Sequence, residues 1–116
     1  MIAQRAAYLE AAGSAVALLS DPAVAAAWDR PSALAQLAVS GLAGHLARQV
    51  LTLPVVLGHG IAADDSVSLL DHYSRVSWIG AGLDDEISAG IRGDGQRTAA
   101  GGQAALWRRP ARRWLT

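Results

Sequence analysis

The chain has 116 residues, which allows one domain with a modest core, and 52% of its residues are apolar while only 5% are aromatic. Cysteine is absent, so disulfides, thiolate metal sites and a cysteine nucleophile are excluded. The formal net charge is zero, and because neither a signal peptide nor a membrane-spanning segment can be recognised, we expect a cytoplasmic protein without a membrane partner.

The first predicted elements are a long helix and a short one. Apolar residues recur at helical spacing from Tyr8 to Leu19 and predict the long helix. Asp21 follows as a capping residue, and Pro22 stands where the first turn of the next helix would begin. We therefore expect a short helix over residues 22–28.

The second long helix is predicted over residues 39–57. Its apolar residues fall within an arc of about 100° around the helix axis, the width expected of a face turned towards the core. They are Val39, Leu42, Ala43, Leu46, Val50, Leu53 and Leu57. Pro54 should kink or end this helix, and a loop over residues 58–63 should follow it.

The third long helix is predicted as one continuous element over residues 68–92. Ser68 and Asp71 have the spacing of a capping box, and apolar residues recur at helical spacing along the whole segment. Gly93 and Gly95 are expected to end the helix. Since no segment shows the alternation typical of a strand, the predicted fold is all-α, with three long helices and a short one.

The C-terminal residues differ in charge from the rest of the chain. Residues 96–116 contain five arginines and no acid, whereas residues 1–95 contain five arginines and all ten acids. We therefore divide the chain into a helical body, residues 1–95, and a basic tail, residues 96–116. Trp107 and Trp114 could stack on bases beside these arginines, but the acidic body would oppose association. A nucleic-acid partner is therefore disfavoured.

His45 lies at the border of the apolar arc of the second long helix, where it could be either a packed residue at the edge of the core or one ligand of a metal. A catalytic zinc ion needs three protein ligands and an open position, and one imidazole cannot hold it. His72 could pair with His45 across two helices, whereas His59 lies in a loop between glycines. No His-x-x-x-His or His-Glu-x-x-His motif supplies paired ligands. From the position of His45 alone, a structural role at the edge of the core is therefore the favoured interpretation.

Other polar groups do not indicate catalysis. Asp84, Asp85 and Glu86 are consecutive, so on a helix they point in different directions and form a solvated face. The serines have no recognisable base partner, and we assign no catalytic residue.

Three stretches of the chain are similar to one known family. They are YLEAAGSAVALL followed by Trp28, then SALAQLAVSGLAGHLARQV, then HYSRVSWIGAGLDDEISAGIR. Over residues 5–105 this order resembles the mycothiol-dependent maleylpyruvate isomerase family, whose members are DinB-like metal-binding four-helix bundles of actinobacteria. The resemblance implies an up-down bundle in which His45 is one ligand of a divalent metal, usually zinc. In the family, a glutamate and a histidine on the fourth helix complete the site, and the ion activates the thiol of mycothiol or orients the substrate.

The chain departs from this pattern after residue 106, where the family continues into its fourth helix. The sequence turns instead to WRRPARRWLT, a composition expected of GC-rich DNA read in a shifted frame. We therefore expect a truncated or frameshifted member with an incomplete DinB-like bundle and an incomplete metal site. Thiol-dependent isomerase or transferase activity should be small or absent.

An incomplete bundle would leave apolar side chains in water. Without a fourth helix, the apolar faces of the other three helices would be partly exposed to water. If about five Leu, Ile or Val side chains stay exposed, the folded state loses on the order of 7–15 kcal/mol of burial free energy. That is similar to the whole stability of a domain, about 5–15 kcal/mol. We expect the chain either to form a homodimer or bind a partner helix through the exposed groove, or to be a loose helical ensemble. The alternative function is thus a non-catalytic helical interaction module.

Overall fold

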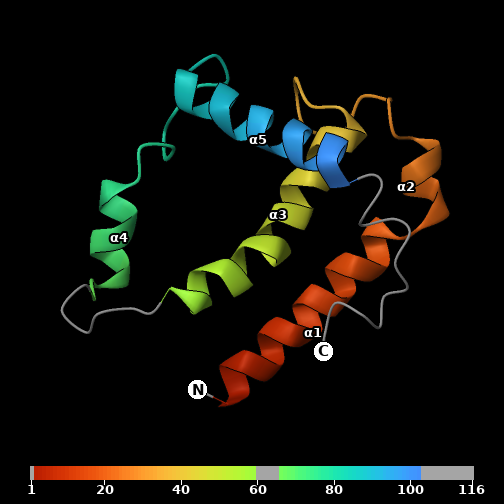
Figure 1. Ribbon diagram of the computed structural model, residues 1–116. Coiled ribbons are helices and arrows are strands. Elements are labelled where there is room, and N and C mark those ends of the chain that lie inside the picture. Colours follow the sequence, from red (N-terminus) through yellow and green to blue (C-terminus); the bar gives the residue numbers. More distant parts are fainter. Residues whose placement is uncertain (1, 60–65, 103–116) are drawn as a thin grey trace.

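The chain folds into helices connected by loops (Figure 1). The computed structural model describes residues 2–59 and 66–102. The helices in these ranges are α1 Ile2–Leu19, α2 Pro22–Ala26, α3 Val39–Gly58, α4 Leu69–Arg75 and α5 Glu86–Gly102. The described ranges contain no strand beyond a single bridge pair between Pro31 and Ala38. The predicted all-α class is therefore confirmed for this part of the chain.

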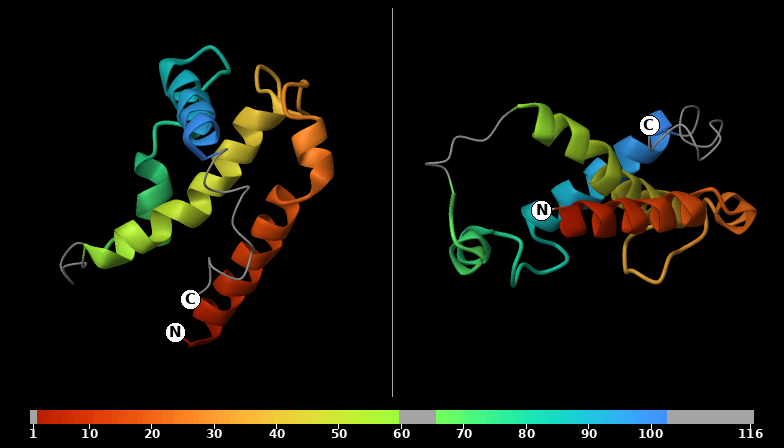
Figure 2. Two further views of the ribbon diagram at one scale, coloured as in Figure 1. Left: turned by 45° about the vertical axis from the view of Figure 1, so that its right-hand side comes forward. Right: turned by 90° about the horizontal axis from the view of Figure 1, so that it is seen from below.

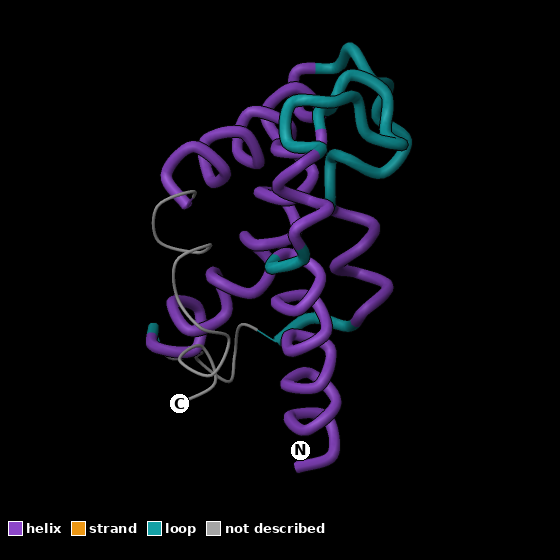
Figure 3. Tube along the Cα trace, turned by 90° about the vertical axis from the view of Figure 1, so that its right-hand side faces the viewer, coloured by secondary structure: helices purple, strands orange, loops and turns teal. Residues whose placement is uncertain are grey.

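The central helix is α3, which packs against α1 on one side and against α5 on the other (Figures 1 and 2). The core around it is thin, because no large side chain of the described residues is fully buried. The buried apolar residues are Ala12, Val16, Leu19, Leu37, Ala43, Ala47 and Ala99. Most loop residues lie at the end of the molecule opposite the N-terminus (Figure 3).

The helices α3 and α5 cross with their backbones in contact. A Cβ atom on Gly44 would overlap the carbonyl oxygen of Gly95, and one on Gly95 would lie 2.6 Å from the carbonyl oxygen of Gly41. Buried Ala47 and Ala99 flank these positions on the two helices. The crossing therefore depends on glycines that leave no side chain between the helices.

The predicted continuous helix over residues 68–92 is wrong, because the structure breaks it into α4 and the start of α5. Gly80 has a φ of +80°, a conformation that favours glycine. Asp85 accepts a hydrogen bond from the Gly82 N–H at 2.7 Å, so the chain turns just before α5 begins. The predicted stop at Gly93 and Gly95 is also wrong, since both glycines lie inside α5.

The two predicted N-caps are present in the structure, whereas the proline expected to kink or end α3 does not end it. The Asp21 side chain accepts a hydrogen bond from the Ala23 N–H at 2.8 Å. Ser68 Oγ likewise accepts one from the Asp71 N–H at 3.1 Å, and both predicted N-caps are confirmed. Pro54 does not end α3, which continues to Gly58.

The division between body and tail falls inside α5. The helix continues without interruption from residue 95 to Gly102. Residues 103–116, which hold the tryptophans and four of the arginines of the predicted tail, lie outside the described residues, as do residues 60–63 of the predicted loop.

Candidate functional site

His45 lies on the side of α3 that faces α5. A Cβ atom on Gly95 would stand 3.3 Å from His45 Cβ, which shows how close the opposite helix is. The side chain is half-buried and borders two hollows that share His45 and Ile91. The imidazole is therefore placed between the helices rather than on an outward face.

The polar hollow, of about 540 Å³, is the larger of the two. Its lining consists of His45, Arg48, Gln49, Trp78, Ile91 and Asp94. Asp94 forms ion pairs with both Arg48 and Arg97. Hydrogen bonds from these guanidinium groups, Arg48 first, hold the pKa of Asp94 below its usual value of 3.8. The Asp94 carboxylate is therefore already occupied by two arginines.

The described residues do not fit a zinc site. Within residues 2–59 and 66–102, no three His, Cys, Asp or Glu side chains lie close enough to hold a metal. His59 Nδ1 lies 2.6 Å from the Val55 carbonyl oxygen, and exposed His72 lies edge-on to Tyr73. The remaining residues of the sequence contribute carboxylates only at positions 64 and 65 and no histidine. The ligand role of His45 and its pairing with His72 stay predictions.

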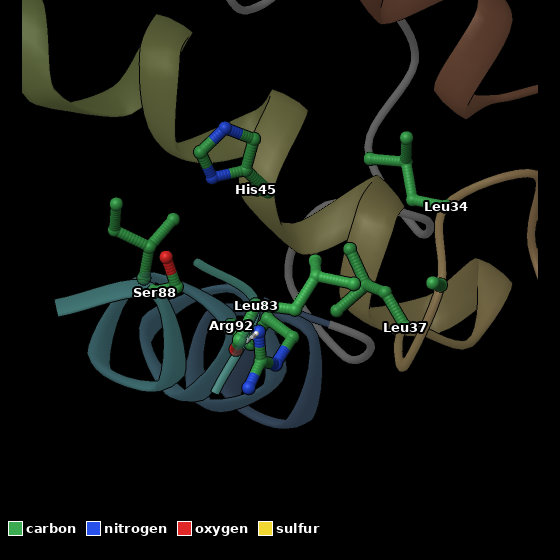
Figure 4. A pocket seen from close by; sticks show the side chains of 8 residues that line it. Leu34, Leu37, His45, Leu83, Ser88 and Arg92 are labelled. Carbon is green, nitrogen blue, oxygen red and sulfur yellow. Dashed lines mark hydrogen bonds between the residues drawn. The ribbon is translucent and has the colours of Figure 1, made fainter. Parts of the chain in front are cut away.

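The apolar hollow, of about 220 Å³, lies between α3, the start of α5 and the loop before α3 (Figure 4). Its lining consists of Leu34, Ala35, Leu37, His45, Leu83, Ser88, Ile91 and Arg92. Arg92 Nη1 donates to the Leu83 carbonyl oxygen at 2.7 Å and so fixes the residues that precede α5.

The loop before α3 is folded back by its own hydrogen bonds. The Ser32 hydroxyl donates to the Leu37 carbonyl oxygen at 2.6 Å, and its oxygen accepts from the Leu34 N–H at 3.1 Å. Gln36 Nε2 donates to Asp84 Oδ1 at 3.2 Å and links this loop to the residues before α5. These bonds hold Leu34 and Leu37 over the apolar hollow.

The sequence interpretation found His45 but missed Ser88 and Arg92. These two residues are four positions apart on α5, so they lie on the same side of the helix, one turn from each other. The spacing of four residues was the one sequence signal that could have paired Ser88 with Arg92. It did not indicate a binding site, because only the folded loop of residues 30–38 places apolar side chains opposite them.

A second feature is the exposed apolar surface of α4 and its flanking residues, here called the α4 surface. Its side chains are between 46% and 82% exposed and are Val67, Leu69, Leu70, Tyr73, Trp78 and Ile79. All seven residues of α4 are exposed. The rings of Tyr73 and Trp78 meet edge to face with centroids 6.5 Å apart.

Comparison of the chain with family models, with curated proteins and with solved structures gives no match. The resemblance to the maleylpyruvate isomerase family therefore stays a prediction. In the described part of the chain, no helix has both the length and the apolar content needed to cross a bilayer.

Proposed function

We propose that this protein is a helical interaction module that pairs with a second copy of itself through the α4 surface. The observation that carries the proposal is a set of six large apolar side chains, 46–82% exposed, three of them on α4 and three in the residues that flank it. The helix itself buries none of its residues. Monomeric proteins rarely leave so much apolar surface in water unless it serves an interaction.

The helix α4 is too short to be stable on its own. It has seven residues, whereas isolated helices below about 12–15 residues are marginal in water. Most helical stability in proteins comes from packing of an apolar face, but none of the residues of α4 is buried by the described part of the chain. Packing against another molecule would supply the missing stabilisation of α4.

The charges on α4 favour a second copy as the partner. At about 100° per residue, Leu69 and Tyr73 lie on one side of the helix, and Asp71 and Arg75 lie on the opposite side. Two such apolar faces can meet across a two-fold axis without burying a charge. The formal net charge of zero also means that two copies do not repel each other.

The exposed apolar area of the α4 surface is of the order that a dimer interface buries. Taking about 150–250 Å² for a large side chain, the exposed fractions of the α4 surface correspond to roughly 500–900 Å². A stable interface buries about 800 Å² per partner. The partly exposed side chains next to α4 would add to it.

The test is the oligomeric state of the Leu70→Glu variant, measured by sedimentation equilibrium over a range of concentrations. Leu70 is 82% exposed, so glutamate should leave the fold of the single chain intact but place a charge in the interface. We expect a dimer for the unmodified chain and at least tenfold weaker association for the variant. Leu18→Glu is the matched control, since Leu18 is 58% exposed on α1 and should leave association unchanged.

Two results would refute the proposal. One is a chain that stays monomeric at every concentration, and the other is equal weakening by Leu18→Glu and Leu70→Glu. A complex with a different protein but no homodimer would assign the surface to that partner instead.

A second candidate is the metal-dependent, mycothiol-related function and DinB-like fold that the resemblance implies. The place of His45 between α3 and α5 supports it, and the shortage of further ligands among the described residues opposes it. Zinc titration followed by calorimetry tests it. Binding that is lost in His45→Ala and kept in His59→Ala would support this candidate, and binding that survives His45→Ala would remove it.

A further inference from the structure

The apolar hollow has walls suited to a small aliphatic group. Leucine, isoleucine and alanine side chains form most of its lining, and no Trp, Tyr or Phe takes part. An apolar cavity of about 150 Å³ accommodates benzene. The hollow of about 220 Å³ therefore suits a ligand of roughly seven to nine non-hydrogen atoms.

Two half-buried polar side chains in this lining, His45 and Ser88, have no hydrogen-bond partner among the described residues. The His45 ring nitrogens and the Ser88 hydroxyl make no hydrogen bond with the described part of the chain. They lie on facing helices (Figure 4). Polar groups removed from water are usually paired, because leaving them unpaired costs free energy. A bound group that accepts from Ser88 or pairs with His45 would satisfy them.

The charged group that lines the hollow is Arg92. Its Nη1 is bonded to the Leu83 carbonyl oxygen, but a guanidinium has five N–H donors in a planar fork that fits a carboxylate. Within residues 2–59 and 66–102, no carboxylate forms an ion pair with Arg92. The remaining Arg92 donors favour an anion.

We propose that the apolar hollow binds a small branched aliphatic carboxylate, whose acid group is held by Arg92 with support from Ser88 and His45. The branched carbon chain packs on Leu34, Leu37 and Leu83. Inorganic phosphate supplies the charge but leaves these apolar walls in water, so it should bind much more weakly.

The test uses 3-methylbutanoate, titrated into the isotopically labelled full chain and followed by NMR. We expect saturable binding with a Kd on the order of 1 mM and nuclear Overhauser contacts from the ligand methyl groups to Leu83 and Ile91. Three comparison ligands separate the contributions: 3-methylbutanamide has the shape without the charge, acetate has the charge with one methyl group, and phosphate has the charge alone. All three should bind at least about tenfold more weakly.

The variants assign the roles of the side chains. Arg92→Gln should weaken binding about tenfold or more, and Ser88→Ala by about threefold to tenfold, as expected for losing a charged and a neutral hydrogen bond. The matched controls, Arg75→Gln and Ser66→Ala, alter exposed residues outside the hollow and should have no effect. If Arg92→Gln fails to fold, Ser88→Ala and the ligand contacts still decide the question.

No saturable binding, equal binding of the amide, or ligand contacts only to residues outside the hollow would overturn the proposal. The measurement does not depend on association between chains, because the hollow is separate from the α4 surface. A monomeric chain that binds the carboxylate would refute only the dimer, and a dimer that does not bind it would refute only this inference.

Discussion

At the crossing of α3 and α5, position 44 has room for a hydrogen atom and nothing larger. The carbonyl oxygen of Gly95 occupies the place where a Cβ atom would stand. In the interior of a helix, glycine usually costs about 0.5–1 kcal/mol relative to alanine. At Gly44 this cost is offset by the close contact that the glycine allows.

We therefore expect Gly44→Ala to destabilise the protein by about 1–3 kcal/mol, the usual range for overpacking. Gly13→Ala is the matched control, because Gly13 lies inside α1 with no atom within 4 Å of an added Cβ. It should stabilise the protein by about 0.5–1 kcal/mol. Urea unfolding at one fixed protein concentration measures both effects. A Gly44→Ala variant as stable as Gly13→Ala would contradict the close crossing.

Residue types and spacing predicted some individual roles correctly and missed others. Asp21 and Ser68 were identified as caps because capping depends on neighbours within three residues. Ser88 and Arg92 were missed because their surroundings come from residues about fifty positions earlier in the chain. The position of His45 predicted a residue at the edge of the core and only the family resemblance made it a candidate ligand, because the neighbours of a side chain cannot be derived from one helix.

At the scale of elements, Asp94 connects α3 to α5. Its carboxylate accepts hydrogen bonds from Arg48 on α3 and from Arg97 on its own helix. These bonds lower the pKa of Asp94 in the folded state below 3.8. The stabilisation is therefore fully present above the unfolded pKa and is lost as the pH falls through the lower, folded value.

We expect the difference in the free energy of unfolding between the unmodified chain and Asp94→Asn to be constant above about pH 5 and to shrink as the pH falls below 3.8. Denaturant unfolding of both proteins, at about one pH value per pH unit between pH 2 and pH 7, measures this difference in unfolding free energy. In an Arg48→Gln background the difference should be smaller at neutral pH. A difference independent of pH would show that Asp94 is not held by the arginines.

The break between α4 and α5 shows where periodicity is insufficient. Apolar residues keep a helical spacing across residues 76–85, so the pattern favoured one helix. The conformation of Gly80 and the Asp85–Gly82 hydrogen bond interrupt it. Conversely, α5 continues through Gly93 and Gly95 although its glycines have low helix propensity. Packing against α3 outweighs propensity there.

At the scale of the whole molecule, the described helices do not close around a core. The Cα radius of gyration is 15.9 Å, compared with about 13 Å for a compact domain of this size. The molecule measures 46 × 39 × 21 Å. Buried alanines replace the larger side chains that would otherwise fill a core. Association with another chain is the physical means by which such a flat arrangement would bury more apolar surface.

From the glycine contact between α3 and α5 we expect a definite order of local opening. Backbones that touch cannot separate by small steps, because a slight displacement already loses much of the dispersion contact between them. The α3–α5 pair should therefore open as one unit, whereas α4, with no buried residue, can fray alone. A fluctuation that frees α4 should leave the apolar hollow assembled, so that the proposed partner could dissociate while the proposed ligand stays bound.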